Sequence, residues 1–196
     1  MKTYINNILG IAVVIMVVFA ACNKKQVASK NNEAKDQTMA EETKAPSVDI
    51  FAASFVGNLK AVEQHIGVGT DLNQKDQYGS TPLIIAITFG KTEVSKALIE
   101  AGADFHCRTA DGSTPLHMAS FFCRTEIVEK LLEAGADKSL VNKMGSTPLD
   151  AMLVPFDQIK PVYLQISKDL GPLGLKFDYD YIERTRPQIA QMLQDK

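Results

Sequence analysis

The sequence repeats itself at a fixed interval. The motif Gly-Ser-Thr-Pro-Leu begins at Gly79 and recurs 33 and 66 residues later. A second motif, Gly-x-Asp, begins at Gly69 and recurs at the same two intervals. Two independent motifs with one period indicate a structural unit of about this length, which cannot cover its own apolar faces and is stable only when stacked on its neighbours. The chain must therefore contain an array of stacked units.

Each copy carries the signals of a turn followed by two helices. Gly79 and its equivalents lie at the tip of a hairpin, where a positive φ is needed. The threonine two positions later can cap a helix that begins with the following proline, where a missing N–H costs least. A second helix with one apolar face follows, and Gly102 or Gly135 ends it in the left-handed conformation. We expect one hairpin and two antiparallel helices in each unit.

The segment Thr-Pro-Leu-His-Met-Ala-Ser at 114–120 resembles the signature of the ankyrin repeat family, and the resemblance covers residues 48–152. It implies an all-α ankyrin-repeat solenoid with β-hairpin fingers and with capping helices at both ends. The first unit lacks Thr-Pro-Leu and is expected to begin at its first helix, with Ser47 as the N-cap.

The end of the chain departs from the repeat pattern. Pro155 and Pro161 interrupt the register of the fourth unit, and Tyr179 to Asp195 is predicted to form a last helix that is broken or kinked near Pro187. The expected divisions are a capping repeat at 48–73, repeats at 74–106, at 107–139 and from 140 to 152 onward, and a C-terminal helical cap at 153–196.

Residues 1–21 have the features of a secretory signal. Ile8 to Ala21 is an uncharged run of fourteen residues, which is shorter than the roughly 20 apolar residues that span a bilayer. Phe19-Ala20-Ala21-Cys22 resembles the lipobox of bacterial lipoproteins, in which the signal is cleaved before the cysteine and the thiol receives lipid; the alternative is an ordinary signal peptide with an incidental cysteine. The resemblance implies a lipid anchor on Cys22. Asn23, in place of the aspartate that retains lipoproteins in the inner membrane, implies the outer membrane, facing the periplasm.

The segment 22–47 is predicted to be a disordered tether. It is rich in Lys, Glu, Asn, Gln, Ser and Thr, and Val27 and Met39 are its only large apolar side chains. Such a segment cannot bury enough apolar surface to offset the entropy cost of ordering. We expect it to hold the repeats near the bilayer without fixing their orientation.

Composition and motifs exclude several classes of function. The chain has 21 basic and 23 acidic residues, a net charge of −2, so no positive field favours a nucleic acid. Its three cysteines form neither a zinc-ligand spacing nor a disulfide framework. There is no phosphate-binding loop, nucleophile elbow or zinc-protease helix. The sequence therefore predicts no enzyme activity, no cofactor and no metal.

His117, Cys107 and Cys123 are the side chains with which an enzyme would work. The resemblance instead gives His117 a structural role, with hydrogen bonds between neighbouring hairpins and helices. Cys107 is expected near a hairpin and Cys123 at the far end of a helix that rises about 12 Å, too far for a disulfide. Both thiols are expected to be free, with Cys123 strained in a position that other units give to glycine. The alternative is an enzyme that uses His117 or these thiols.

The resemblance implies that a partner protein binds to the hairpin tips and to the concave face of the first helices. Phe89 and Phe122 are expected to be exposed there, with Arg124 in the polar rim; the alternative is that Phe121 and Phe122 pack between adjacent repeats. The implied partner-binding residues are Gln77, Tyr78, Ser80, Thr88, Phe89, Ala110, Asp111, Ser113, Phe121, Phe122, Arg124, Lys143, Met144 and Ser146.

The predicted function is protein binding without catalysis, by a monomer that is tethered to the bacterial envelope and has a periplasmic protein as partner. One alternative is an immunity or inhibitor protein, or a protein that supports a periplasmic enzyme. Another is a passive spacer whose groove binds nothing. No nucleic-acid partner is expected.

Overall fold

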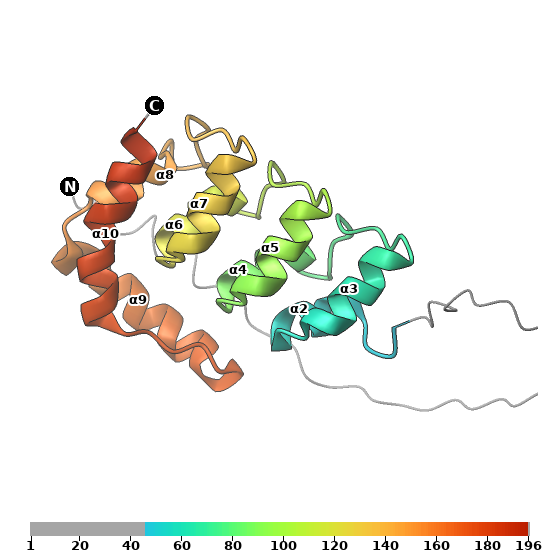
Figure 1. The fold of residues 1–196 in the computed structure, drawn as a ribbon. Helices are drawn as coiled ribbons and strands as arrows, with labels where there is room; N and C mark the ends of the chain where they lie inside the picture. Colours follow the sequence, from blue (N-terminus) through green and yellow to red (C-terminus); the bar gives the residue numbers. More distant parts are fainter. Residues whose placement is uncertain (1–45, 196) are drawn as a thin grey trace, which may run out of the picture.

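The helices form antiparallel pairs that stack into a curved array. The structure is a computed structural model and describes residues 46–195, so the predicted signal peptide, Cys22 and nearly all of the predicted tether lie outside the described residues. In Figure 1 the pairs follow one another along the array, and the loops between them project to one side. The α-helices are α2 (Ile50–Val56), α3 (Leu59–Gly67), α4 (Pro82–Thr88), α5 (Thr92–Glu100), α6 (Pro115–Phe121), α7 (Thr125–Glu133), α8 (Pro148–Leu153), α9 (Phe156–Leu170) and α10 (Tyr179–Gln194), and a short 3-10 helix, η2, covers Gly171–Leu173.

The helices α4, α6 and α8 begin where the sequence predicts. Thr81, Thr114 and Thr147 are their N-caps, and each threonine oxygen accepts a hydrogen bond from the N–H three residues ahead, at 3.3, 3.4 and 3.2 Å. The proline that follows each threonine occupies the first helical position, where no N–H is needed. The cap prediction is therefore confirmed in all three copies.

The N-cap of α2 differs from the prediction. Asp49, not Ser47, caps this helix, and its carboxylate accepts the N–H groups of Phe51 and Ala52, both at 3.0 Å. The aspartate immediately precedes the first helical residue, so its side chain reaches the amides of the first turn, and a carboxylate is also favoured at the positive end of the helix. Ser47 lies too far before the helix to do the same.

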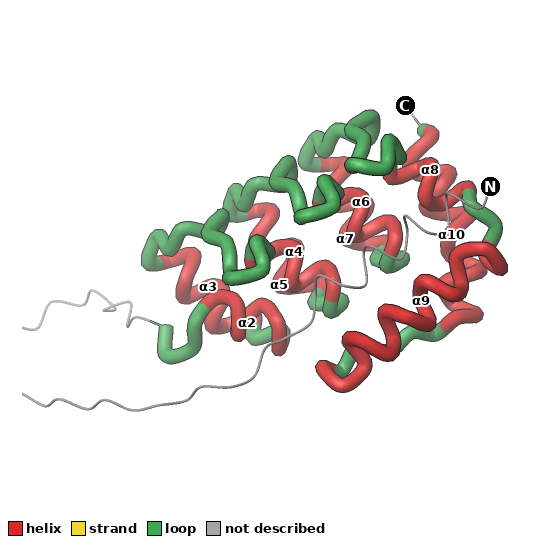
Figure 2. The backbone as a smooth tube through the Cα atoms, turned by 180° about the vertical axis from the view of Figure 1, so that it is seen from behind, coloured by secondary structure: helices red, strands yellow, loops and turns green. Residues whose placement is uncertain are grey.

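The loops between the pairs are closed turns, which we call fingers: residues 76–80, 109–113 and 142–146. One backbone hydrogen bond of 3.0 Å closes each, from the N–H of Asp76, Thr109 or Asn142 to the carbonyl four residues later. No residue from 46 to 195 lies in a β-strand, so the predicted β-hairpins are tight turns rather than strand pairs. Figure 2 shows them side by side along one edge.

One apolar core passes through all the units. The first helices contribute a row in register with the repeat, Ala53, Ala86 and Ala119, all fully buried, and Met152 continues it. Small side chains in this row let neighbouring helices approach closely. Equivalent helices of adjacent units are in contact along the array, which confirms the prediction that the units are stable by stacking. No helix between residues 46 and 195 is both long and apolar enough to cross a membrane.

The fourth unit is completed by α10 rather than by the next helix in sequence. α10 packs against α8 as α7 packs against α6, and it contacts α7 as α5 does. Residues 154–178, which we call the insert, connect α8 to α10 and contain α9 and η2. Figures 1 and 2 show α9 at the edge of the array opposite the fingers. Pro187 does not break α10, which runs uninterrupted from Tyr179 to Gln194.

Two buried polar side chains attach the insert. Tyr163 of α9 is completely buried, and its hydroxyl donates to the carbonyl of Phe121 at 2.6 Å. Arg186 of α10 donates through Nη1 to the Tyr163 hydroxyl at 3.3 Å. The Nη2 group of Arg186 donates to the carbonyls of Ala151, Met152 and Val154 at 2.8, 3.1 and 2.6 Å. Arg186 thus satisfies the carbonyls at the end of α8 and holds α9 in place at the same time.

Candidate protein-binding surface

The side chain of the first residue fixes the tip of two fingers. Asp76 Oδ1 accepts the N–H groups of Tyr78 and Ser80, both at 2.8 Å. Asn142 makes the equivalent two bonds in the third finger, at 2.9 and 3.1 Å. These bonds satisfy backbone donors that would otherwise need water and fix the tip conformation.

The second and third fingers are joined. The N–H of Lys143 donates to the carbonyl of Asp111 at 2.9 Å, and Arg108 Nη1 donates to the carbonyls of Gly112 and Val141, both at 2.8 Å. Position 112 requires glycine because φ is +80° and a Cβ atom would lie 3.1 Å from the backbone nitrogen of Lys143. The second and third tips are therefore joined to each other instead of being independent loops.

His117 connects the fingers to the helices, as predicted. Its Nδ1 lies 2.8 Å from Thr114 Oγ1 and accepts the Thr114 N–H at 3.2 Å, and its Nε2 lies 3.0 Å from the carbonyl of Ser146 in the next finger. Nε2 is then the protonated nitrogen and donates to Ser146. Burial lowers the pKa of His117, which favours the neutral ring that these bonds require. A ring held at both nitrogens has no free nitrogen for a substrate.

The thiols of Cys107 and Cys123 lie in different environments. Cys107 Sγ is 3.8 Å from Thr81 Oγ1, whereas Cys123 Sγ is 3.8 Å from the carbonyl of Ile182 in α10. Burial raises the pKa of both thiols, that of Cys123 to about 11, whereas a nucleophilic cysteine needs a lowered pKa. Among residues 46–195 no group of three or more His, Cys, Asp or Glu side chains could hold a metal ion.

The predicted partner-binding residues divide by exposure. Gln77, Ala110 and Lys143, which occupy the same position in successive fingers, are exposed. Four predicted residues are buried and are therefore removed from the surface: Thr88, Ser113, Phe122 and Ser146. The half-buried residues are Tyr78, Ser80, Phe89, Asp111, Phe121, Arg124 and Met144.

The expected exposure of Phe122 is wrong, and the insert is the reason. Phe122 is 4% exposed and forms an apolar cluster with Ile166, Leu170 and Leu175 of the insert. Its ring is stacked on Phe177 at 6.0 Å. The residues that cover Phe122 therefore come from the fourth unit and not from the turn of its own repeat.

Phe121 and Phe89 are covered only in part. Phe121 stacks on Tyr163 of α9 with 4.7 Å between ring centroids. Phe89 packs at the edge of the same cluster and meets Phe55 edge to face at 4.5 Å. The alternative, in which Phe121 and Phe122 are packed, is right for Phe122, and Phe121 packs against the main core as well as against the insert.

The first helices contain a row that sequence reasoning missed, which we call the concave row. Ala52, Ile85, Met118 and Ala151 follow one another at the interval of the repeat, one in each first helix, and all are half-buried. The signal was present in the sequence, because positions one repeat apart occupy equivalent places in successive units. This row and the finger tips form the candidate surface.

Arg124, predicted to lie in the polar rim, has a mainly structural role. It precedes α7, its guanidinium lies over Gly90, and a Cβ atom at position 90 would be 2.7 Å from its Cζ. Its Nη2 is 3.4 Å from the carbonyl of Thr88, and burial lowers the pKa of the guanidinium. Cys123 occupies the glycine position of the third repeat with φ of 53°, as expected from the sequence.

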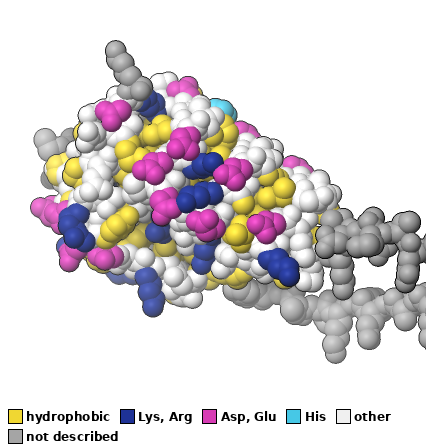
Figure 3. All heavy atoms as spheres, viewed as in Figure 1, with side chains coloured by type: hydrophobic (Ala, Val, Ile, Leu, Met, Phe, Trp, Pro, Cys, Tyr) yellow, Lys and Arg dark blue, Asp and Glu magenta, His cyan; other side chains and the backbone are white. Residues whose placement is uncertain are grey.

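The outer face of the array differs from the finger edge. Acidic and basic side chains alternate there over α5 and α7, as Figure 3 shows. Lys96 lies 2.5 Å from Glu126, and Lys130 lies 2.6 Å from Glu100, so these ion pairs join the two helices. Exposed pairs of this kind contribute little to stability, and their charges already have partners.

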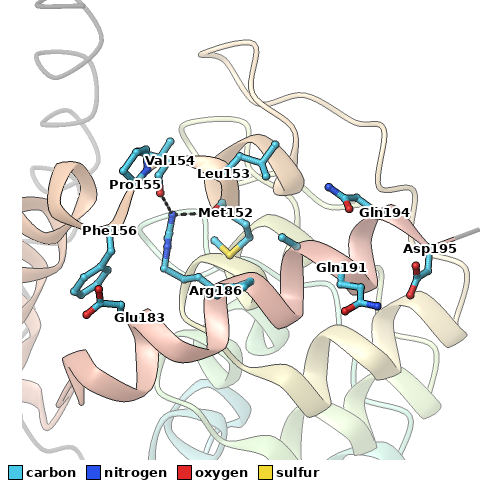
Figure 4. Close-up of a pocket in the computed structure, with 12 residues that line it drawn as sticks. Met152, Leu153, Val154, Pro155, Phe156, Glu183, Arg186, Gln191, Gln194 and Asp195 are labelled. Carbon is cyan, nitrogen blue, oxygen red and sulfur yellow. Dashed lines mark hydrogen bonds between the residues drawn. The ribbon is translucent and has the colours of Figure 1, made fainter.

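A shallow cavity of about 670 Å³ lies at the free end of the array, between the end of α8 and α10. Figure 4 shows Arg186 projecting from α10 toward Met152 and Val154, with Glu183 beside Phe156. Because its Nη atoms are directed at carbonyls and at Tyr163, this arginine does not present a free charge to the cavity.

These features define a class of protein, a solenoid of stacked helix pairs with a preformed edge of turns. A family model described as "Ankyrin repeats (3 copies)" matches residues 50–149, and the chain belongs to this family. Ankyrin repeats are protein-interaction modules and are generally non-catalytic. A comparison with curated proteins gave no match.

Proposed function

We propose that this protein is a non-catalytic adaptor of the bacterial envelope, which binds another protein along its finger edge and concave row. The observation that carries the proposal is the regular presentation of the tips. Gln77, Ala110 and Lys143 project from consecutive fingers whose conformation is fixed by hydrogen bonds. A surface that is already ordered loses little conformational entropy when a partner binds.

The proposed position in the cell rests on the N-terminal sequence. The uncharged run before Phe19-Ala20-Ala21-Cys22 supports export and lipidation of Cys22, and the tether that follows would keep the repeats close to the outer membrane on its periplasmic side. Metabolic labelling with an alkyne fatty acid tests the anchor. Label should be incorporated into the wild type and lost in Cys22→Ser, with release of the protein from the membrane fraction.

The binding surface is tested by photo-crosslinking in intact cells. A photoreactive residue at Gln77, Ala110 or Lys143 should capture the same periplasmic protein from each position. The matched control is Glu129, which is exposed on α7 away from the fingers. Equal capture from position 129, or no capture from any of the three tips, would reject the proposed surface.

A further inference from the structure

Three apolar side chains at the edge opposite the fingers are not covered by the core. Phe55 and Val56 end α2, and Phe89 follows α4. Val56 is 59% exposed, and the ring of Phe55 is half-buried against Phe89. Phe55 and Val56 belong to neither of the two apolar clusters of residues 46–195. We call these three residues the apolar strip.

The apolar strip continues the line of the insert. Phe89 packs at the edge of the cluster that contains Phe122, Ile166 and Leu170, together with Leu173 of η2. The insert therefore covers the end of α6 and reaches Phe89, and the strip lies beyond that point. Because α9 docks there as an amphipathic helix, this side of the array is already suited to a helix with one apolar face.

A basic side chain, Lys91, borders the strip. α2 and α4 contain no charged residue. A charged side chain lying directly on the strip would therefore find no opposite charge on these two helices. The stem of Lys91 lies against Gly57, the residue after Val56, and a Cβ atom at position 57 would be 2.9 Å from Lys91 Cδ. Lys91 forms no ion pair within residues 46–195, and Glu93, in the first turn of α5, pairs with Lys96 instead. A carboxylate from a partner would give Lys91 the ion pair that it lacks within these residues.

We propose that the apolar strip binds the apolar face of an amphipathic helix from a partner protein, which lies in line with α9 and places an acidic flank beside Lys91. This inference rests on the proposed function, because the helix belongs to the protein held by the fingers. It adds a second contact, between the apolar strip and a helix of the partner. This contact lies beside the insert, which already occupies the neighbouring part of the same edge. The finger edge then selects the partner, and the strip anchors one of its helices.

The test uses the full-length chain in detergent and a fluorescent peptide of about fifteen residues, roughly four helical turns, with a leucine stripe and a glutamate flank. Two peptides of matched length serve as comparisons: one has a lysine flank, and the other has the same composition with the stripe scrambled. Fluorescence anisotropy should show saturable binding of the first peptide, about tenfold weaker binding of the second and none of the third. Lys91→Glu should reverse the preference between the flanks.

Val56→Asp is the decisive variant because the side chain is exposed and the fold does not depend on it. We expect it to weaken the glutamate-flanked peptide by at least about tenfold. Val68→Asp, at a residue 40% exposed at the end of α3, should leave binding unchanged. No saturable binding, or equal effects of the two variants, would overturn the inference.

Other outcomes separate this inference from the proposed function. Tip crosslinks without peptide binding would reject the strip and leave the finger surface standing. Peptide binding lost in Val56→Asp, together with absent tip crosslinks, would keep the strip and reject the finger surface. A dimer seen by light scattering that Val56→Asp dissociates would identify a second copy as the occupant and overturn the partner helix.

Discussion

The third and fourth repeats connect their two helices in different ways. In the third, Cys123 in the left-handed conformation turns the chain directly from α6 into α7, as Gly90 does in the second. In the fourth, Val154 after α8 is extended, and the chain makes the excursion of the insert before α10 docks. The carbonyls that end α8 bond to Arg186 instead. The comparison shows that the tight turn is replaceable, provided that another donor satisfies the end of the first helix.

Replacing Arg186 should have the largest effect on stability, because the fourth repeat has no tight turn to take its place at the end of α8. In Arg186→Met the carbonyls at the end of α8 and the buried hydroxyl of Tyr163 lose their donor, and we expect a loss of about 3 kcal/mol in the free energy of unfolding. Urea denaturation followed by circular dichroism measures it. Arg184→Met, at the exposed arginine two residues earlier in α10, is the control and should change stability little. Equal effects would mean that Arg186 does not take over the role of the turn.

Two glycine variants measure what the tight turn contributes to stability. Gly90 and Gly102 both have positive φ, 65° and 84°, but only at position 90 would a Cβ atom meet a neighbour, the guanidinium of Arg124. Gly102→Ala should cost about 1 kcal/mol for the backbone conformation alone, and Gly90→Ala about 2 kcal/mol because Arg124 must also move. Thermal denaturation of both variants separates the two contributions. In an Arg124→Ala background, Gly90→Ala should cost only as much as Gly102→Ala does; an unchanged cost of about 2 kcal/mol would show that the contact with Arg124 is irrelevant.

The same contrast explains which parts of the fold could be predicted from the sequence. The 33-residue interval and the Thr-Pro caps predicted the helix pairs and the fingers, whereas the structural role of His117 was implied by the resemblance to the ankyrin family. The place of α10 could not be read in this way, because the insert removes its helix from the register that identifies the others. Its pairing with α8 depends on contacts between residues far apart in the chain.

The same holds for the binding surface: positions fixed by the repeat were predicted correctly, and positions covered by distant residues were not. Register places Gln77, Ala110 and Lys143 on equivalent tips, and they are exposed. Phe122 was misplaced because its cover comes from residues more than forty positions later, for which no repeat pattern exists. Arg186 gave no signal either, since a lone arginine in a helix is normally solvated. Long-range burial, rather than local conformation, is what the sequence did not reveal.

His117 offers a test through pH, because only the third repeat has histidine at this position; the equivalents are Ile84 and Asp150. Burial sets the pKa of His117 below its ordinary value of 6.5. Its contribution to stability is therefore complete above pH 6.5 and is lost as the pH falls below that value toward the folded pKa. Unfolding measured from pH 8 to 5 in wild type and His117→Ile should show a difference in stability that shrinks on acidification. A difference that stays constant over this range would mean that protonation of His117 does not affect the stability of the fold.

The smallest effect is expected from the ion pairs on the outer face of the array. Lys96 joins α5 to α7 through Glu126, whereas residues 46–195 contain no such ion pair between α7 and α10. If surface pairs held the array together, the fourth repeat would need one, yet it docks through buried side chains such as Ile182 and Ile189. Both partners of the Lys96 pair are solvated, so ordering the side chains offsets most of the attraction between the charges. Lys96→Met should therefore leave the urea midpoint unchanged at physiological salt, and the comparison at low salt should reveal at most a small shift. A clear loss at physiological salt would show instead that electrostatics, and not apolar stacking, joins the second repeat to the third.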